Sequence, residues 1–549
     1  MTTKLSRKLS SLFGALVLLF SLFVAIPAEL QTVHAASSIK VTINDSTKNS
    51  SYNGYQLLKA DVGEGDAVTY SLNDKYKDIV LKAAGVSDFD GLKKFLEEHK
   101  GSQNPTTGED ATLREFADKV YKDISKANLK ADQTFKSGEN TLDTANAGYY
   151  LLADATAPKA DSTKDPYNYS ATLLTGLVNK DVTLNVKSTT PIVHKKVLEG
   201  NPGATNTRNY VDATDYNIGD TVPFMITGTI SSQIKSYDKY TYYFTDTLPK
   251  GLTLDKDSIV VQAENVTSGY AKGINATDAT KLKPSTKPEE GGYTTTVTNN
   301  DDGTTTLKVE INNLKDLVKA KTVKTSDTIV VTYNAKLNKD AVVGQAGNTN
   351  NVKLTYSNNP YNDQTGTTTN RNAKVYTYGL VVNKTGNDNK PLTGAGFTLY
   401  KKNGDDRTEV AKLDPSQKTD NSKIVAKVDE TGTKFEFSGL DQGEYVISET
   451  TVPKGYKKAD DITFKITAEF DKQNSADAAL KTLSVDNTAL TVDRDDSGVI
   501  DTTVNNKSDT GFELPSTGGM GRYIFLAVGA LIVLAAIVVP SLKKKKLEN

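Results

Sequence analysis

The stretch GEYVISETTVPKGY, from Gly443 to Tyr456, decides the fold because it combines a strand pattern with a carboxylate in an apolar position. Alternation along a strand places Tyr445, Ile447 and Glu449 on one face, and the Pro and Gly that follow are typical of a turn. A carboxylate in a protein core is costly unless it is neutralised or paired. Two interpretations stay open from this stretch alone: Glu449 lies in the core with a partner, or the alternation is shifted by one residue and Glu449 lies in water.

Two other strands of the same region also carry a polar residue in phase with apolar ones. The opening strand LVVNKTG places Lys384 in phase with leucine and valine, and the closing strand TTVNNKS places Asn506 in phase with Val504. Asn506 is preferred over Asn505 because of that phase. An amine, an acid and an amide on the first, a late and the last strand predict a buried constellation. The plain alternative is an exposed lysine, an exposed acid and an asparagine in a turn.

These three side-chain types favour one reaction if they meet in a core. Burial lowers the pKa of a lysine and raises that of a glutamic acid, so the pair can exist as neutral amine and neutral acid. The Lys384 amine can then attack the side-chain carbonyl of Asn506 while protonated Glu449 polarises it. Ammonia leaves, and a Lys–Asn isopeptide bond remains. Fixed proximity in a dry core accelerates the step.

A second region repeats the arrangement with an aspartate as the acid. The stretch TPIVHKKV places Lys195 in phase with apolar neighbours, YYFTDTLPKGLT does so for Asp246, and GNTNNVKLTYSNNP does so for Asn350. Lys196 and Asn351 are the alternatives if the strand phase is shifted by one residue.

The surroundings of Glu449 resemble a known family motif. Its setting, Y-x-x-x-E-T-x-x-P-x-G-Y, is similar to the E-box of Cna B-type domains in Gram-positive pilins. The resemblance implies that Glu449 is the catalytic acid and Lys384 the bond-forming lysine. The second region resembles pilin domains that form a Lys–Asn bond with an aspartate catalyst. The first region has Asp154 in place of the glutamate and Asn44 in place of the lysine, so we expect no bond there.

The fold class expected for the chain is all-β, with tandem immunoglobulin-like (Cna-type) β-sandwich domains. Strand-like segments dominate, and turn clusters separate them. Apolar residues at helical spacing in DFDGLKKFLEEHK and TLREFADKVYKDI predict a helical insertion in the first domain. The expected division is a signal peptide at 1–36, an N-terminal sandwich at 37–187, a second sandwich at 188–374, a Cna B-type sandwich at 375–509, a linker with sorting motif at 510–519, and a transmembrane helix with basic tail at 520–549.

The two ends of the chain have the composition of targeting segments. Lysine and arginine precede the apolar run LFGALVLLFSLFVAIPA, and VHAA offers small residues for cleavage, which predicts a cleaved N-terminal signal peptide. Near the other end, YIFLAVGALIVLAAIVVPSL is long and apolar enough for a transmembrane helix, and KKKK follows it. The positive-inside rule places that tail in the cytoplasm, so the chain between the two segments is expected outside the cell.

A short motif precedes the apolar segment. LPSTGG, with a hydrophobic segment and a basic tail after it, resembles the sorting signal of Gram-positive surface proteins. The residues that match the signal are Leu514, Pro515, Thr517 and Gly518. The resemblance implies that a sortase cleaves between Thr517 and Gly518 and joins the threonyl carboxyl to an amine.

The amine of the next subunit is also assigned by resemblance. The pilin motif of the family places the linking lysine at the end of the last strand of the first domain, usually as Tyr-Pro-Lys. Here that place has VTLNVKSTTP, so Lys187 is favoured, although the Tyr and Pro are missing, and Lys180 in LVNKDV is the alternative. Joining each subunit to the next in this way is a heterologous contact that makes a fibre.

Composition and motifs exclude several other classes. Lys and Arg (66) balance Asp and Glu (67), so nucleic-acid binding is not expected, and the absence of cysteine removes disulfides and thiol chemistry. The stretch DRDDSGVID imitates an EF-hand loop but lacks its closing glutamate, so it is interpreted as a β-turn. We expect no metal and no cofactor.

The function expected is that of a structural backbone subunit in a covalent cell-surface pilus anchored to the Gram-positive cell wall. It is not an enzyme beyond its own isopeptide formation. Expected partners are pilin-specific and housekeeping sortases, identical subunits, minor pilins and peptidoglycan, with host matrix proteins as a further candidate. The alternatives are a wall-anchored adhesin that does not polymerise and a minor pilin at the tip or base.

Overall fold

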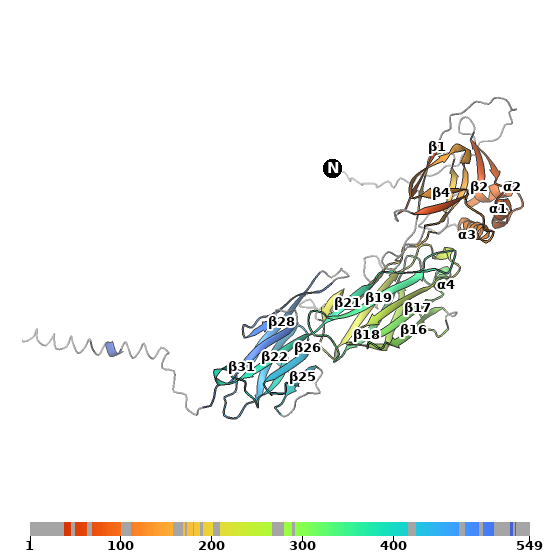
Figure 1. The fold of residues 1–549 in the computed structure, drawn as a ribbon. Coiled ribbons are helices and arrows are strands. Elements are labelled where there is room, and N and C mark those ends of the chain that lie inside the picture. The colour runs from red at the N-terminus through yellow and green to blue at the C-terminus, as the bar shows by residue number, and fades with distance from the viewer. Residues whose placement is uncertain are drawn as a thin grey trace, which may run out of the picture.

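The computed structural model shows strands that form six sheets, arranged as three pairs along an elongated molecule (Figure 1). We call the pairs the first sandwich (β1 to β8), the second sandwich (β9 to β21) and the third sandwich (β22 to β31). The predicted class, tandem β-sandwiches with a helical insertion in the first, is confirmed. The structure describes residues 38–45, 50–62, 68–99, 111–156, 168–170, 173–178, 180–186, 190–200, 209–265, 279–287, 291–415, 424–471, 478–492, 498–509, 528–530 and 533.

The first sandwich has a small sheet in the order β5-β1-β8 and a larger one in the order β3-β2-β6-β7, with β4 beside β2. Its strands are β1 (Ser38–Asn44), β2 (Ser51–Val62), β3 (Val68–Leu72), β4 (Gln133–Lys136), β5 (Gly138–Asp143), β6 (Gly148–Asp154), β7 (Leu173–Val178) and β8 (Val182–Asn185). Strand β6 buries residues on both faces, because Leu152 packs towards the small sheet and Leu151 towards the helices. The larger sheet is therefore the middle of three layers.

Three helices form the outer layer: α1 (Lys77–Ala84), α2 (Phe89–His99) and α3 (Ala111–Lys126). The sequence predicted α2 and α3, and both are confirmed. In α3 the residues Phe116, Val120 and Ile124, spaced four apart, are all buried against strand β2 and β6 side chains. Helix α1 was not predicted, because it has only about two turns and so offers little periodicity.

The second sandwich pairs a sheet in the order β10-β9-β12-β18-β14-β15 with one in the order β11-β21-β19-β13-β17-β16, in which β20 lies beside β19. Its elements are β9 (Val193–Leu198), β10 (Tyr210–Val211), β11 (Ala213–Asp215), β12 (Thr221–Thr229), β13 (Tyr242–Leu248), β14 (Leu252–Glu264), β15 (Thr280–Lys281), β16 (Gly292–Asn299), β17 (Thr305–Asn312), α4 (Leu314–Lys319), β18 (Thr328–Leu337), β19 (Asn348–Ser357), β20 (Thr365–Thr367) and β21 (Arg371–Tyr376). Alternating residues of both sheets, such as Phe224, Phe244 and Leu354, fill the core between them.

The third sandwich pairs sheets in the orders β25-β26-β22-β31-β30 and β24-β23-β27-β28-β29. Its strands are β22 (Tyr378–Thr385), β23 (Gly396–Asn403), β24 (Asp406–Leu413), β25 (Val425–Val428), β26 (Lys434–Leu440), β27 (Gly443–Thr451), β28 (Ile462–Phe470), β29 (Leu480–Val485), β30 (Leu490–Val492) and β31 (Val499–Asn505). Its first strand, β22, pairs in parallel with its last, β31, which brings Lys384 opposite Val504.

The first and third sandwiches share this plan. Strand β1 lies between an antiparallel neighbour, β5, and a parallel one, β8, just as β22 lies between β26 and β31. Strand β2 pairs with β6 as β23 pairs with β27. The likeness between GYQLLKA and GFTLYKK, and between GYYLLADAT and GEYVISETT, therefore has a counterpart in topology.

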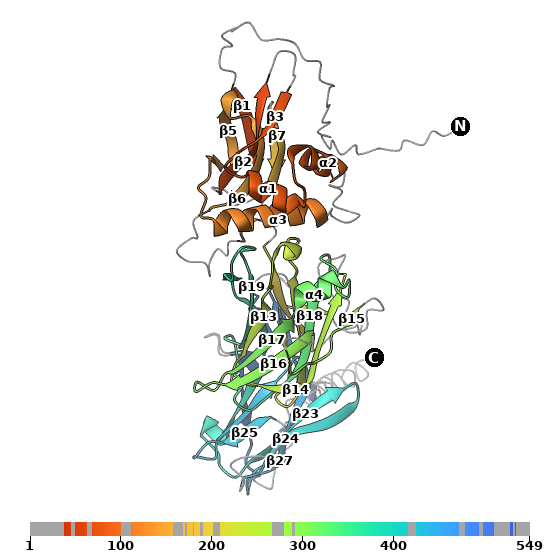
Figure 2. The same cartoon turned by 90° about the vertical axis from the view of Figure 1, so that its right-hand side faces the viewer.

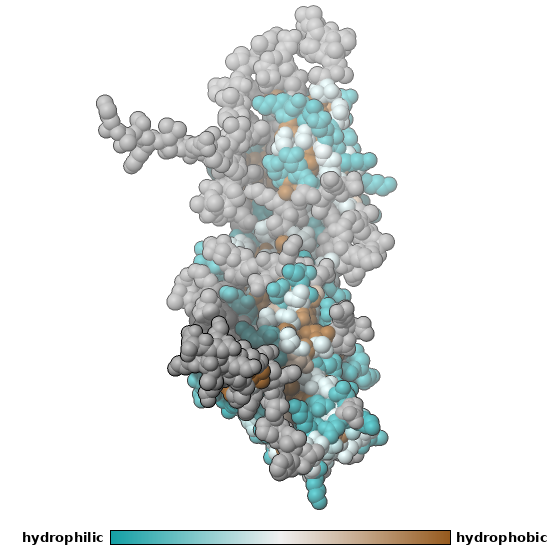
Figure 3. Space-filling view, turned by 90° about the vertical axis from the view of Figure 1, so that its left-hand side faces the viewer, coloured by the Kyte–Doolittle hydropathy of each residue, from teal (hydrophilic) through white to brown (hydrophobic). Residues whose placement is uncertain are grey.

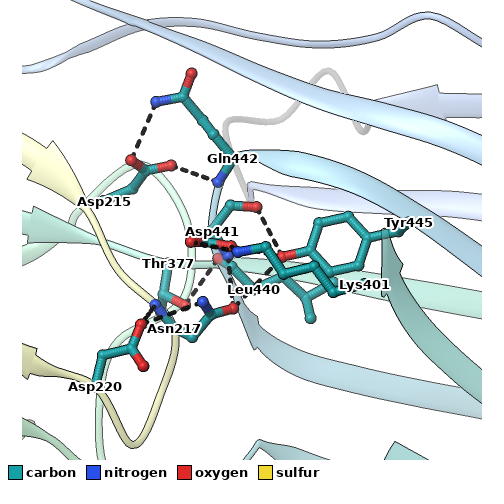
Figure 4. A network of polar contacts seen from close by, with 9 residues as sticks. All are labelled: Asp215, Asn217, Asp220, Thr377, Lys401, Leu440, Asp441, Gln442 and Tyr445. Carbon is teal, nitrogen blue, oxygen red and sulfur yellow. Dashed lines mark hydrogen bonds and ion pairs between the residues drawn. The ribbon is translucent and has the colours of Figure 1, made fainter. Parts of the chain in front are cut away.

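The second and third sandwiches meet through a polar network that links the end of β11 and the loop after it to the turn between β26 and β27 (Figure 4). The Asp215 carboxylate accepts hydrogen bonds from the backbone nitrogen of Gln442 (2.7 Å) and from its side-chain amide (3.1 Å). The Asp441 carboxylate accepts from Lys401 Nζ (2.6 Å) and from the Tyr445 hydroxyl (2.6 Å). Only one residue separates β21 from β22. Just before β31, Gly498 has a φ of 64°, and a Cβ there would lie 2.2 Å from the Cα of Gly344 in the second sandwich.

The first sandwich contacts the second through α3, which lies at the end nearest the second (Figure 2). Lys122 Nζ donates to Asp238 at 2.6 Å, and the ring of Tyr121 packs against that of Tyr361 with centroids 4.5 Å apart. On the face shown in Figure 3 the coloured surface is mostly hydrophilic, and brown areas are small. Among the described residues no helix is both long and apolar enough to cross a membrane. The predicted signal peptide, and the predicted transmembrane helix except for residues 528–530 and 533, lie outside those residues.

Candidate functional site

The second sandwich brings together the lysine, aspartate and asparagine that the sequence singled out. Lys195 comes from β9, Asp246 from β13 and Asn350 from β19, and all three are at most 1% exposed. Strand alternation explains the burial of Asp246, because Phe244 and Leu248 on either side of it point into the same core. Lys195 belongs to one sheet and the other two residues to the opposite sheet, so the three side chains meet between the layers.

The lysine and the aspartate contact each other directly in apolar surroundings. Lys195 Nζ donates to both carboxylate oxygens of Asp246, at 2.7 and 2.6 Å, and lies 5.1 Å from the ring centre of Phe224. Burial lowers the pKa of Lys195 to about 8, although Asp246 opposes the shift. Burial also raises the pKa of Asp246, and here Lys195 opposes it. Both shifts favour a neutral amine beside a neutral acid.

A tyrosine that the sequence analysis missed completes this site. The Tyr333 hydroxyl, on β18, donates to Asp246 (2.5 Å) and accepts from Lys195 Nζ (2.8 Å) and from Asn350 Nδ2 (2.7 Å). Burial, with the Asp246 carboxylate adding to it, raises the pKa of Tyr333 well above its usual value, so the hydroxyl stays protonated. The alternation in TIVVTYNAKL points Tyr333 inward together with Val331, and that was the available signal.

The third sandwich assembles its own lysine, glutamate and asparagine. Lys384 on β22, Glu449 on β27 and Asn506 just after β31 are 1%, 2% and 1% exposed. Asn506 Nδ2 donates to both oxygens of Glu449, at 2.8 and 3.0 Å, and the backbone nitrogen of Ala459 donates to Glu449 at 2.8 Å. Of the two interpretations of GEYVISETT, the structure therefore has the one in which Glu449 is buried.

Lys384 lies where β22 and β31 run side by side. Its Nζ donates to the carbonyl oxygens of Thr385 (2.7 Å) and Val504 (3.2 Å). Burial lowers the pKa of Lys384, and the charge of Glu449 opposes the shift. The amine is therefore moved towards its neutral, nucleophilic form in this site as well.

In both sites the asparagine oxygen is buried without a hydrogen-bond partner. Among the described residues this holds for Oδ1 of Asn350 and of Asn506. A buried, unsatisfied carbonyl costs about 1–3 kcal/mol. Because no donor contacts this oxygen, it can accept a hydrogen bond from a protonated acid while the lysine attacks the amide carbon. Each core therefore contains an amine, an acid that can carry a proton, and an amide that can be attacked.

The alternatives left open by the sequence lie in other surroundings. Lys196 is buried but pairs with Asp212 at 2.7 Å. Asn351 is only half-buried. Asn505 is exposed, and its side-chain nitrogen donates to the Gly386 carbonyl at 2.6 Å.

The first sandwich has different residues in the corresponding places. Asn44 is exposed, and its side chain donates to that of Asn185 at 3.0 Å. Asp154 is half-buried and accepts from the backbone nitrogens of Thr156 (3.0 Å) and Ser170 (2.9 Å). Asn44 therefore does not occupy the inward position that was expected from the sequence; the buried residue beside it is Ile43, so β1 buries no lysine at this end.

The remaining predicted sites are only partly described. Lys187 and the sorting residues Leu514, Pro515, Thr517 and Gly518 lie outside the described residues. Lys180 is described and exposed. Of the stretch DRDDSGVID, only its last four residues are described. Within the part of the chain that the structure describes, no group of three or more His, Cys, Asp or Glu side chains could hold a metal ion.

Three family models match separate parts of the chain. Residues 218–360 match the Gram-positive pilin backbone subunit 2, Cna-B-like domain. Residues 379–480 match the prealbumin-like fold domain, and residues 506–549 match the LPXTG cell wall anchor motif.

A curated relative and several solved structures are also similar. The trypsin-resistant surface T6 protein of Streptococcus pyogenes serotype M6 is 25% identical over 422 residues, which is 66% of this chain and 70% of the relative. The structure of the T6 backbone pilin of serotype M6 Streptococcus pyogenes has a TM-score of 0.49 and 18% identity, and covers 87% of this chain and 99% of that one. The structure of the Corynebacterium diphtheriae major pilin SpaA has a TM-score of 0.40 and 15% identity, and covers 86% of this chain and 100% of that one.

Proposed function

We propose which residues form internal cross-links in this chain and which residues join it to the next subunit, on the premise that it is a sortase-assembled backbone pilin of Gram-positive bacteria with Cna-B-like domains. It is a structural subunit of a polymerised pilus shaft on the cell wall and is not a catalyst for other molecules. The domain boundaries that we propose are 37–187, 188–374 and 375–509.

The first part of the proposal is that two domains form internal isopeptide bonds, Lys195–Asn350 and Lys384–Asn506. The observation that carries it is the burial of an amine, an acid and an amide in one core, twice in one chain. The amine is hydrogen-bonded to the acid in the second sandwich, and the amide is hydrogen-bonded to the acid in the third. In each reaction the bond from lysine Nζ to asparagine Cγ forms, the Cγ–Nδ2 bond breaks, and ammonia leaves. Asp246 and Glu449 act as the proton carriers.

The two bonds would differ in what they connect. Lys384–Asn506 would join β22 and β31, which are adjacent parallel strands and the first and last strands of the third sandwich. Lys195–Asn350 would cross between the sheets, from β9 to β19. The last strand of the second sandwich is β21 and not β19. The two strands pair, and Asn350 of β19 lies opposite Ala373 of β21. Force entering the second sandwich would pass through the bond and then through that strand pair.

The second part of the proposal concerns the joining of subunits. A pilin-specific sortase cleaves between Thr517 and Gly518 and transfers the threonyl carboxyl to Lys187 of the next subunit, with Lys180 as the alternative. A housekeeping sortase attaches the base of the fibre to peptidoglycan, and minor pilins and host matrix proteins are further partners. The matched anchor motif at residues 506–549 supports the cleavage site, and the end of β8 at Asn185 supports the position of the lysine.

Immunoblots of cell-wall extracts test the joining. The wild-type chain should give a ladder of high-mass polymers, and Lys187→Ala should reduce it to monomer. Lys180→Ala is the matched control, because Lys180 is an exposed lysine seven residues earlier in the sequence, and it should keep the ladder. A ladder that survives Lys187→Ala but is lost in Lys180→Ala would move the linkage to Lys180.

A further inference from the structure

The two sites use acids of different length, and in the second sandwich the shorter acid is connected to the leaving nitrogen through a tyrosine. In the third sandwich, both oxygens of Glu449 contact the nitrogen that must leave Asn506, at 2.8 and 3.0 Å. Aspartate is shorter by one methylene. In the second sandwich the leaving nitrogen of Asn350 contacts the Tyr333 hydroxyl at 2.7 Å, and that hydroxyl contacts Asp246 at 2.5 Å.

We propose that Tyr333 is a catalytic proton relay that carries a proton from Asp246 to the leaving nitrogen of Asn350. The proposal rests on the Lys195–Asn350 bond of the proposed function. In this site an aspartate and a tyrosine together do what Glu449 does alone in the third sandwich. The Tyr333 hydroxyl touches two reacting nitrogens, Lys195 Nζ and Asn350 Nδ2, so it belongs to the reacting group itself.

The proton transfers balance. The Lys195 ammonium first gives a proton to the Asp246 carboxylate, and the neutral amine attacks Asn350 Cγ. Tyr333 then gives its proton to the Asn350 nitrogen while Asp246 gives its proton to the Tyr333 oxygen. The Asp246 carboxylate takes the second proton from the attacking nitrogen, and ammonia leaves. At the end Tyr333 is again a phenol, Asp246 is a neutral acid, and the lysine nitrogen carries one hydrogen.

The surroundings of Tyr333 suit a relay. Because its proton is replaced as it leaves, the phenol oxygen never has to bear a full charge in the core, where a phenolate would be costly. The ring is held by stacking on Phe224, with centroids 5.5 Å apart and planes inclined by 25°. Strand β18 lies between β12 and β14 in its sheet, so the hydroxyl is carried on an interior strand.

Replacing the hydroxyl tests the relay. Tyr333→Phe in the extracellular chain should form the Lys195–Asn350 bond about 100-fold or more slowly, the usual effect of losing an acid–base group. Freshly purified Tyr333→Phe should then be one ammonia heavier than wild type, and peptide mapping should find Lys384–Asn506 intact. The matched control is Tyr356→Phe. It removes a hydroxyl that is buried in the same core and has no hydrogen-bond partner among the described residues, so this variant should form both bonds like wild type.

A second variant separates chemistry from packing. In Asp246→Glu/Tyr333→Phe the longer acid should reach the Asn350 nitrogen, as Glu449 reaches that of Asn506, and restore the bond. A loss caused only by packing would not be restored in this way, so failure of the double variant would overturn the relay even if Tyr333→Phe folds poorly. Bond formation in Tyr333→Phe at the wild-type rate would also overturn the relay and leave the proposed bond standing. A wild-type chain without the Lys195–Asn350 bond would overturn both.

Discussion

At the scale of single residues, Glu449 and Asp246 show how a β-sandwich accommodates a buried acid. Glu449 is 2% exposed and accepts from Asn506 and from the backbone of Ala459. Asp246 is fully buried and accepts from Lys195 and Tyr333. Each carboxylate has donors for both of its oxygens, which offsets the loss of water.

Glu449→Gln should keep the shape of the third site and abolish its chemistry. Glutamine cannot accept the proton of Lys384, so we expect no Lys384–Asn506 bond and a mass one ammonia higher. Losing a cross-link over about 120 residues should lower the free energy of unfolding by about 4–5 kcal/mol. Intact mass and denaturant unfolding measure the two effects.

Asn505→Ala is the control for Glu449→Gln. It alters the neighbouring asparagine, whose side chain is exposed, and should leave both the bond and the mass loss unchanged. Peptide mapping that finds the bond in Glu449→Gln would contradict the role of the acid.

The sequence was sufficient to predict which polar residues point inward, but not all of their neighbours. Period-two alternation selected Lys195, Asp246 and Asn350, because each has apolar residues two positions away. The same alternation points many tyrosines inward, and it says nothing about which of them meets Asp246. Tyr333 lies 87 residues from Asp246 in sequence, so only the packing of β18 on the opposite sheet identifies it.

At the scale of elements, the pairing of β22 with β31 decides how the third sandwich responds to force. A pull on its two ends acts on the first and last strands, which lie side by side and would be joined by Lys384–Asn506. Without the bond, only the ladder of hydrogen bonds between these strands resists.

Single-molecule stretching should show this difference directly. In the wild-type chain the residues between Lys384 and Asn506 should add no length at any force that spares covalent bonds. In Glu449→Gln, unfolding of the third sandwich should release about 120 residues, which is roughly 400 Å of extended chain. Equal extension of the two proteins would contradict the covalent path.

The polar contacts between the second and third sandwiches should respond to pH through Asp215 (Figure 4). Burial, with the charge of Asp441 adding to it, raises the pKa of Asp215 to about 6, while hydrogen bonds from Gln442 oppose the shift. Lys401 and Tyr445 bind Asp441 on the other side. Because the folded chain holds this proton more tightly than the unfolded chain, the contribution of Asp215 to stability is greatest below about pH 4. It should fall as pH rises to about 6, by about 2–3 kcal/mol.

Asp215→Asn should remove that pH dependence. The measurement is the unfolding free energy of the extracellular chain between pH 4 and 7. The slopes of this free energy against pH are compared, and not its absolute values, because the asparagine also changes one hydrogen bond to Gln442. Asp220→Asn is a matched control, because that carboxylate accepts from Asn217 within its own loop (3.1 Å) and should keep the wild-type slope. Identical slopes for Asp215→Asn and wild type would contradict the assignment.

Elements with strong periodicity were predictable, whereas contacts between distant loops were not. The apolar stripe of α3 and the alternation of β13 are local patterns, and both were recognised. The short helix α1 offers too few turns for such a pattern. The bond from Gln442 to Asp215 spans 227 residues, and no local pattern indicates it.

At the scale of the whole molecule, three sandwiches follow one another, and we expect isopeptide bonds in the second and third only. On β1, the strand that corresponds to β22, the buried residue near the end is Ile43 and not a lysine, and Asp154 on β6 is only half-buried. We therefore expect the first sandwich to be held by its noncovalent core and its helices alone.

Amide hydrogen exchange should rank the sandwiches accordingly. Strands β1 and β6 should exchange fastest among core strands, and strands of the second and third sandwiches should be protected about a thousandfold more, as expected for about 4–5 kcal/mol per cross-link. In Glu449→Gln, protection in β22 and β31 should fall towards that of β1. Protection of β1 equal to that of β31 in the wild-type chain would contradict this ranking.

The order of the sandwiches and their sheet character followed from the sequence because strand and turn patterns repeat along the whole chain. The packing of α3 on the second sandwich through Tyr121 and Tyr361 did not, because both residues are amphipathic and fit a solvent-facing position equally well.

The mass of the intact recombinant extracellular chain tests the central claim most directly. Each isopeptide bond expels one ammonia, so the measured mass should be lower than that of the plain translation by two ammonias, and mapping should locate them at Lys195–Asn350 and Lys384–Asn506. A mass equal to the plain translation would contradict self-formed cross-links in both sandwiches.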